Sequence, residues 1–267
     1  MAEMKVAAFM PVLNEGGRIS RAIRSLRNQT HPVSKLIVVD GGSTDSTHEE
    51  VRRHAEQASF DIELEILEGE GVRYSSQYGA KKAADHITEE CGEDDGIVLR
   101  LEGDSALEDH FLDEAVSYLQ SDTYTVFGAP VKPHDPRDKR MTKRIFTFLQ
   151  NAEGLPKGRG MAFRAQDFYD VDGYRMHEDE NIQNSKVDCL EDGIIVSKLR
   201  DRGKVAFSHD TYVNSTVPST TATSLERWRL AVKIEREMGP TKYFTKIASP
   251  LNKLTYASKR IASRVRV

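Results

Sequence analysis

Two carboxylates separated by one glycine are the residues of this sequence best suited to chemistry. Glu102-Gly103-Asp104 directly follows the apolar stretch 96–101, a pattern typical of a buried strand that ends in an acidic loop. Side chains two residues apart on an extended backbone project to the same side, so both carboxylates can approach one hard divalent cation. The triplet therefore predicts a site for Mg²⁺ or Mn²⁺ that attracts phosphate. The alternative is an acidic loop that only turns the chain.

A second apolar stretch also ends in an acid. Residues 36–39 are all aliphatic and lead into Asp40, after which a turn rich in glycine and hydroxyl groups covers 41–45. Ser46 and Glu49 then form a capping-box pattern that predicts the start of a helix. Two strands thus deliver carboxylates to one edge of the molecule.

The elements that position these acids follow from hydrophobic periodicity. It predicts strands near 6–9, 35–40, 62–66, 96–101 and 124–129, and helices through 19–26, 46–55, 80–87 and 111–119. Such alternation indicates an α/β fold with a mostly parallel central sheet flanked by helices. Ligands of such sheets bind beyond the carboxyl ends of the strands, so the loops 11–15, 40–45 and 102–104 should converge on one crevice.

Composition excludes several classes of protein. The 267 residues carry a net charge of −4 and are 38% hydrophobic, so the chain can bury a large core and has no global basic field for nucleic acid. Two cysteines are too few for a disulfide framework, and no stretch approaches the ~20 apolar residues of a membrane span. We expect a cytoplasmic protein, either soluble or peripheral at the cytoplasmic membrane face. No dinucleotide-binding or P-loop glycine motif occurs.

Five short motifs in order resemble those of the family-2 inverting glycosyltransferases, over roughly residues 4–215. They are Pro-Val-Leu-Asn-Glu at 11–15, Ser-Leu-Arg-Asn-Gln-Thr at 25–30, Val-Val-Asp-Gly-Gly-Ser-Thr-Asp at 38–45, Glu-Gly-Asp at 102–104 and Glu-Asp at 191–192. The resemblance implies a GT-A fold in residues 1–215, with a nucleotide-sugar-binding half at 1–130 and an acceptor half at 131–215. It also implies a UDP- or GDP-linked sugar donor and a divalent metal held by the acidic triplet.

The resemblance also implies which residues bind the donor. Pro11, Leu13 and Glu15 would line the nucleoside pocket, Asp40 would bind the base, and the triplet 102–104 would meet the diphosphate. An ionised carboxylate only accepts hydrogen bonds, so Asp40 suits an N–H of a base or a ribose hydroxyl. Asp40 and Asp45 can instead cap the next helix, and for Asp45 capping is the preferred interpretation.

Two departures from the family pattern affect the donor site. The triplet begins with Glu102 where the family usually has aspartate, so we expect Asp104 to bind the cation directly and Glu102 to act directly or through water. The family often has an Arg-Asn pair where this chain has Ser76 and Gln77. Arg73, three residues before Ser76, can reach the same helix face and the diphosphate, or it can be an ordinary solvated arginine.

The acceptor side is expected around the acidic pair Glu191-Asp192. By the resemblance, Asp192 would accept the proton of the attacking hydroxyl and Glu191 would orient the acceptor, and a base matters less if the acceptor is a lipid phosphate. The alternative is an acidic pair that only favours a helix start. Gly160 would lie beneath the donor sugar. His209 is either an extra metal ligand or, preferably, a structural residue.

The last part of the chain, 216–267, is expected to be a linker and a basic amphipathic helical tail. Trp228 can stack on an acceptor sugar, although packing on the domain is preferred. Residues 241–267 contain seven basic and no acidic residues, which suggests an anionic membrane surface or a terminal helix with its charges in water. The charged segment 132–140, punctuated by two prolines, predicts a loop.

Taken together, the sequence predicts a metal-dependent inverting hexosyltransferase of glycan or glycolipid assembly. It would move a sugar from a nucleoside-diphosphate donor to an acceptor hydroxyl or a lipid phosphate. Two alternatives stay open, namely a non-catalytic sugar-nucleotide-binding protein and a nucleotidyltransferase of similar α/β layout.

Overall fold

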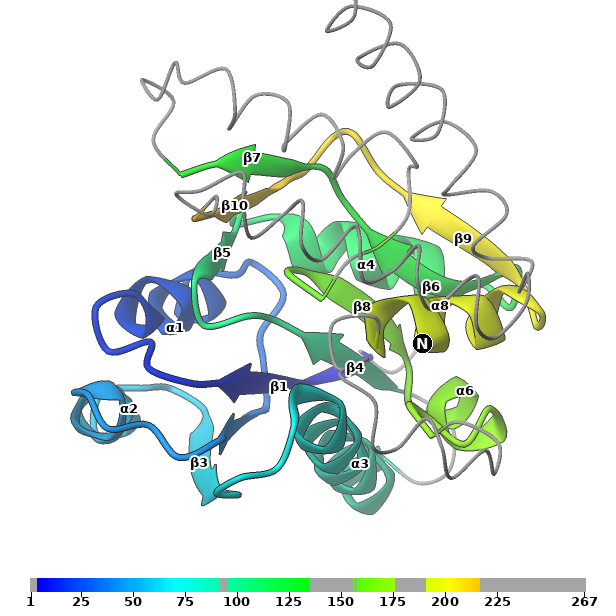
Figure 1. The fold of residues 1–267 in the computed structure, drawn as a ribbon. Coiled ribbons are helices and arrows are strands. Elements are labelled where there is room, and N and C mark those ends of the chain that lie inside the picture. Colours follow the sequence, from blue (N-terminus) through cyan, green and yellow to red (C-terminus); the bar gives the residue numbers. More distant parts are fainter. Residues whose placement is uncertain (1–3, 92–95, 135–155, 157, 176–190, 217–267) are drawn as a thin grey trace, which may run out of the picture. The chain divides into compact units, whose positions relative to one another are not determined.

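The computed structural model describes residues 4–91, 96–134, 156, 158–175 and 191–216. These residues form a seven-stranded sheet in the order β3-β2-β1-β4-β8-β6-β9, drawn in Figure 1. Its strands are β1 (Lys5–Val12), β2 (Lys35–Asp40), β3 (Asp61–Ile66), β4 (Gly96–Arg100), β6 (Tyr124–Gly128), β8 (Met161–Arg164) and β9 (Lys204–Phe207). The first four strands pair in parallel. The expected mostly parallel sheet is therefore confirmed.

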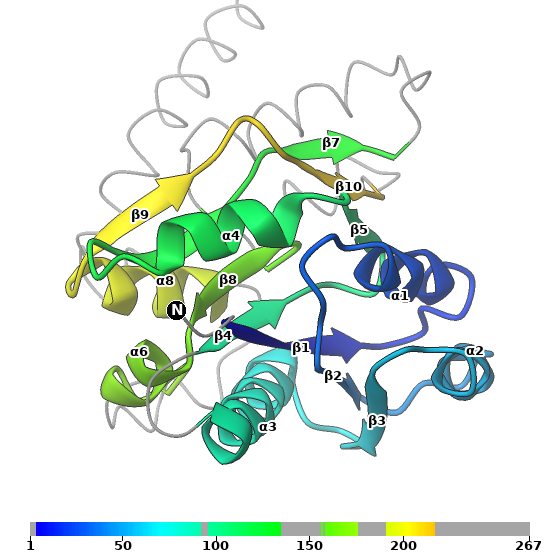
Figure 2. The same ribbon diagram turned by 180° about the vertical axis from the view of Figure 1, so that it is seen from behind.

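Helices cover both faces of this sheet. They are α1 (Ile19–Arg27), α2 (Thr47–Ala55), α3 (Val72–Cys91), α4 (Phe111–Leu119), α6 (Ala165–Asp170) and α8 (Glu191–Arg200). Alternate residues of β1 serve the two faces, since Val6, Ala8 and Met10 pack in the core that includes α1 and α4, whereas Ala7 and Phe9 pack in the core that includes α3 and α8. Figure 2 shows α1 and α4 from the other side. Burial on both faces explains why these strands read as continuous apolar runs.

Two features of the sheets were not predicted. Strand β8 runs antiparallel to both β4 and β6, so residues 158–160, which precede it, lie at the edge where the parallel strands end. A second sheet joins β5 (Ser105–Leu107), β10 (Val213–Ser215) and β7 (Val131–Pro133). Because β7 includes Lys132 and Pro133, the expected loop at 132–140 is wrong at its start.

Local expectations around the first two strands were partly wrong. β1 continues through Pro11 to Val12. The strand tolerates this proline because the side of Pro11 that lacks an N–H faces β4, and β4 ends opposite Phe9. The capping box is absent, as Ser46 makes no side-chain cap at α2. Asp45 caps the helix instead, and its Oδ1 accepts the N–H of Thr47 at 3.0 Å. Among the described residues, no helix is both long and apolar enough to cross a membrane.

We expect Gly79→Val to destabilise the fold by about 2 kcal/mol, a typical cost of overpacking a core. A Cβ at Gly79 would lie 2.9 Å from Cδ2 of Phe9 and 3.0 Å from Cγ2 of Val39, because α3 presses directly on β1 and β2. Urea unfolding measures the change. Gly17→Val is the matched control, since a Cβ there meets nothing within 4 Å. Equal stability of the two variants would contradict the close packing of α3.

Candidate active site

The loops after β1 and β2 are joined by hydrogen bonds at the edge where the parallel strands end. The N–H of Asn14 donates to Oγ of Ser43 at 2.8 Å, and the N–H of Thr44 donates back to Oδ1 of Asn14 at 2.9 Å. Asn14 has a φ of 56°, a left-handed conformation that asparagine tolerates better than most residues. The predicted convergence of these loops is therefore present.

Asp40 lies at the end of β2, and its side chain is fully buried. Oδ2 accepts the N–H groups of Gly42 and Ser43 at 2.9 and 2.8 Å and contacts Nε2 of His48 at 2.9 Å, while Oδ1 accepts the hydroxyl of Ser43. Burial alone would raise the pKa of Asp40, but these bonds lower it below its usual value. Asp40 therefore shapes the turn that follows β2. Leu13, in the loop after β1, is 56% exposed.

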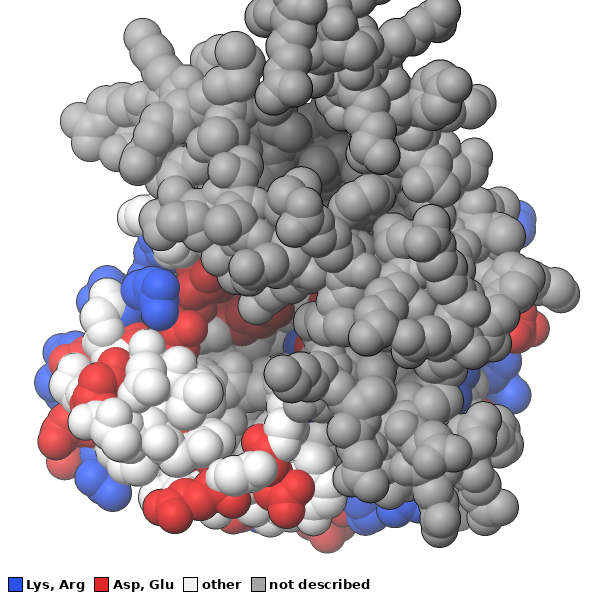
Figure 3. Space-filling model, viewed as in Figure 1, with Lys and Arg blue, Asp and Glu red and all other residues white. Residues whose placement is uncertain are grey.

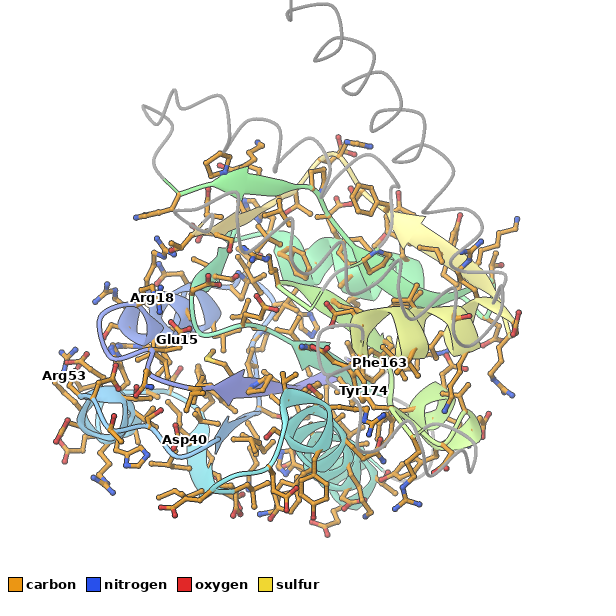
Figure 4. The ribbon with its side chains drawn as sticks, viewed as in Figure 1. Glu15, Arg18, Asp40, Arg53, Phe163 and Tyr174 are labelled. Atoms are coloured by element: carbon orange, nitrogen blue, oxygen red, sulfur yellow. The ribbon has the colours of Figure 1, made fainter. Side chains whose placement is uncertain are left out.

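Glu15 lies beside the acidic triplet. A Cβ on Gly103 would come within 2.9 Å of Cγ of Glu15, so only glycine at 103 allows this approach. Burial and the charge of Asp104 raise the pKa of Glu15 to about 7, although Arg18 opposes the shift through an ion pair of 2.6 Å. Figure 4 shows Glu15 and Arg18 next to each other, and Figure 3 shows acidic side chains gathered on this face.

The small second sheet orients Asp104. Its Oδ1 accepts the hydroxyls of Ser105 at 3.0 Å and of Ser215 at 3.3 Å. Its backbone carbonyl accepts the Arg21 guanidinium and the N–H of Thr216. Residues more than one hundred positions apart therefore fix this carboxylate. Sequence reasoning missed them because serine and threonine near a chain turn carry no distinctive signal.

Glu102 is paired with a protein cation. Nε of Arg159 lies 3.5 Å from Oε2 of Glu102, and Nη1 of Arg159 donates to the carbonyl of Thr216 at 3.2 Å. Burial raises the pKa of Glu102, and the charges of Asp192 and Asp104 act in the same direction. The Asp192 carboxylate is thus close enough to the triplet for its charge to raise the pKa of Glu102.

The described residues contain no group of three His, Cys, Asp or Glu side chains arranged to hold a metal. A two-carboxylate site still suits Mg²⁺ or Mn²⁺, which commonly takes one or two protein carboxylates and completes its shell with water and substrate phosphate. Within the part of the chain that the structure describes, the hydrogen bonds of the Asp104 carboxylate fall on Oδ1, so Oδ2 fits the predicted direct ligand. His209 is exposed, and its ring makes an edge contact with the ring of Phe207.

Glu191 and Asp192 lie in the first turn of α8, where one buried arginine binds both of them. Nη2 of Arg100 lies 2.6 Å from Oε1 of Glu191, and Nη1 pairs with Oδ1 of Asp192. Oδ2 of Asp192 accepts the N–H of Gly158 at 2.8 Å. Sequence reasoning missed Arg100, although a single arginine within the apolar stretch 96–101 was a usable signal, since buried charges are almost always paired.

Burial raises the pKa of Glu191 to about 7, and the adjacent charge of Asp192 adds to the shift, while Arg100 opposes it. One guanidinium faces two carboxylates here, so Glu191 tends to keep a proton near neutral pH. Tyr174 closes the cluster, with its ring centroid 5.7 Å from Cζ of Arg100.

The remaining predicted residues are distributed unevenly. Pro11 is the last residue but one of β1, near the loops described above, and Arg73 lies in the first turn of α3. Gln77, at a position of the family's Arg-Asn pair, accepts the N–H of Tyr174 at 2.7 Å. A Cβ on Gly160 would meet Cγ2 of Val213 at 2.5 Å, so packing requires this glycine. Trp228 and the basic segment 241–267 lie outside the described residues.

Comparison with known proteins identifies the family. Residues 7–177 match the family described as "Glycosyl transferase family 2". The chain belongs to this glycosyltransferase family. A curated relative, an uncharacterized glycosyltransferase of Nostoc sp. (strain PCC 7120), is 28% identical over 120 residues, which are 44% of this chain and 34% of the relative. This family-2 glycosyltransferase therefore spans about a third of that relative's length.

Solved structures confirm the GT-A fold of this family-2 glycosyltransferase. The mannosyltransferase PcManGT from Pyrobaculum calidifontis, in complex with GDP-Man and Mn²⁺, has a TM-score of 0.63 at 20% identity, covering 92% of this chain and 68% of its own. S. aureus TarS in complex with UDP-GlcNAc has a TM-score of 0.57 at 19% identity, with coverages of 91% and 70%. At these identities the likeness shows the fold alone.

We expect Glu191→Gln to remove a pH-dependent loss of stability. The pKa of Glu191 is higher in the folded protein than the ~4.3 of an unfolded chain, so the folded state binds more protons between these values. The free energy of unfolding of the wild type should therefore fall, relative to Glu191→Gln, by on the order of 2 to 3 kcal/mol as the pH rises from about 5 to 8.

Urea unfolding at several pH values measures this difference. Glu56→Gln, at an exposed position after α2, is the control and should follow the wild type at every pH. A constant difference between Glu191→Gln and the wild type would show that Glu191 has an ordinary pKa.

Proposed function

We propose that this protein is a metal-dependent inverting glycosyltransferase that uses a UDP- or GDP-linked sugar. The observation that carries the proposal is the placement of two acidic motifs at one edge of the sheet. The triplet 102–104 follows β4 directly, and the pair 191–192 is bound to Arg100, the last residue of β4. One motif suits a metal–diphosphate and the other suits a proton acceptor, which are the two requirements of direct sugar transfer.

The donor would bind across the loops after β1, β2 and β4. Pro11, Leu13 and Glu15 would line the nucleoside pocket, and the Asp40 turn would support the base through the backbone it holds in place. Asp104 would hold the cation, with Glu102 acting directly or through water, and Arg73 would approach the diphosphate. A bound Mg²⁺ or Mn²⁺ would offset the negative charge that develops on the departing nucleoside diphosphate.

The acceptor hydroxyl would give its proton to Asp192 as its oxygen attacks the anomeric carbon. The attack comes from the face opposite the leaving diphosphate, so the configuration inverts and no covalent enzyme intermediate forms. Glu191 would orient the acceptor. A lipid phosphate, whose second pKa is near ~6, is already largely ionised at neutral pH and would need the base less.

Glycan or glycolipid assembly at the cytoplasmic membrane face fits such acceptors, with the basic segment 241–267 as the membrane contact. A non-catalytic sugar-nucleotide-binding protein is the second candidate, because Glu102 departs from the usual aspartate and is paired with Arg159. Release of nucleoside diphosphate from a donor separates the two candidates. Release of pyrophosphate would instead indicate a nucleotidyltransferase.

We expect Asp104→Asn to abolish the Mn²⁺-dependent stabilisation by a sugar nucleotide, because the amide is a much weaker ligand for a hard cation. A thermal-shift screen of UDP-glucose, UDP-GlcNAc and GDP-mannose with MnCl₂ would identify the donor. A donor at 100 times its Kd adds about 2.7 kcal/mol to the wild type, which raises Tm by several degrees. Asp201→Asn, in the exposed turn after α8, is the control. Undiminished stabilisation of Asp104→Asn would exclude Asp104 as the metal ligand.

We expect Asp192→Asn to bind the same donor with unchanged affinity and to lose turnover by about 10²- to 10⁴-fold, the usual contribution of a general base. Turnover is measured as release of UDP or GDP from the selected donor, with water as the acceptor. Asp201→Asn again serves as the control. Wild-type turnover by Asp192→Asn would remove the base from the mechanism.

A further inference from the structure

Arg100 has the largest fully buried side chain of the described core. Its backbone lies in the middle of the sheet, opposite Phe9 of β1 on one side and Met161 of β8 on the other. A residue paired on both sides has little freedom to shift, so the start of its side chain is fixed by the sheet. Arg100 is also only two residues before Glu102.

The two ends of the guanidinium have separate partners. Nη2 donates a hydrogen bond to Oε1 of Glu191, and Nη1 forms an ion pair with Oδ1 of Asp192, so the two ends of one rigid guanidinium contact the two carboxylates. A lysine ammonium has one charged nitrogen on a flexible stem and lacks the two separate, rigidly spaced nitrogens that contact the two acids here. An arginine without partners would be very costly at this depth, so the burial itself requires that the start of α8 docks on β4.

The segment before β8 packs tightly against this ion pair. A Cβ on Gly158 would lie 2.5 Å from Oδ1 of Asp192 and 2.6 Å from Cζ of Arg100. The N–H of Gly158 meanwhile binds the other oxygen of Asp192 at 2.8 Å. The guanidinium also lies over the ring of Tyr174. The Asp192 carboxylate is thus held at both oxygens by groups that belong to the sheet or to its entry segment.

We propose that Arg100 is the positioning residue that sets where Asp192 stands relative to the acidic triplet 102–104. Arg100 does not meet the substrate; it acts through the carboxylate that takes the acceptor proton. The end of β4 carries both Arg100 and the triplet. The same rigid strand therefore positions the proposed base, through Arg100, and the proposed donor-binding acids. This inference rests on the proposed function, since it assigns Arg100 a part in that reaction.

The test uses the full chain, the donor selected by thermal shift from UDP-glucose, UDP-GlcNAc and GDP-mannose, and MnCl₂. Arg100→Lys keeps the charge but loses the fork, and Gly158→Ala pushes the Arg100–Asp192 pair apart without removing either charge. In both variants kcat for release of UDP or GDP to water should fall about 100-fold, the cost of roughly 1 Å of misplacement. The Kd of the donor should stay within twofold of the wild type.

Two variants control for effects on folding alone. Arg164→Lys alters a second arginine that binds two carboxylates, Asp167 at 2.7 Å and Asp122 at 3.0 Å, and Gly17→Ala adds a methyl group where nothing lies within 4 Å. Both should keep the wild-type kcat. A purely structural role of Arg100 would lower the fraction of folded protein, so donor-binding capacity and turnover would fall together.

The outcomes separate the two proposals. If the wild type binds a donor and releases nucleoside diphosphate, but either folded variant keeps the wild-type kcat, the positioning role is refuted and the proposed function stands. Should Arg100→Lys not fold, Gly158→Ala decides alone. If the wild type releases no nucleoside diphosphate from any of the three donors, the proposed function fails, and the role of Arg100 fails with it.

Discussion

One buried positive charge holds the functional edge of this protein together. Transfer of a guanidinium from water into the core is strongly unfavourable unless carboxylates and hydrogen bonds replace the lost hydration. Arg100 meets this requirement with two acids from α8 and the face of Tyr174. Three segments far apart in sequence, namely the end of β4, the entry to β8 and the start of α8, must therefore come together before the core is stable.

The acids of the triplet 102–104 are held by different chemistry. Asp104 is oriented by the hydroxyls of Ser105 and Ser215, and Glu102 faces Arg159. Burial raises the pKa values of Glu15, Glu102 and Glu191, and the charge of a neighbouring carboxylate adds to the shift of each one. Such crowding of acids is unfavourable alone and is relieved by a nearby positive charge.

Sequence reasoning reached the fold class, the parallel strands and the loops that carry the acids, because these depend on local periodicity. The helix 111–119 was predicted with its observed ends. Sequence reasoning missed β5, β7 and β10, each only three residues long, since such strands exist only through partners distant in sequence. The antiparallel direction of β8 was missed for the same reason, since it depends on pairing with β4 and β6. Arg100 was visible in the sequence, but its partners were not, because ninety residues separate them.

Strand β10 lies between β5 and β7 and brings Ser215 and Thr216 to Asp104. The order of synthesis gives this arrangement a consequence. A nascent chain of 210 residues already contains both acidic motifs, yet it lacks the strand whose hydroxyl and amide hold Asp104 in place. The Asp104 carboxylate can therefore reach its final orientation only after residue 216 has been synthesised, so a chain that stops before β10 would carry both acidic motifs without this support.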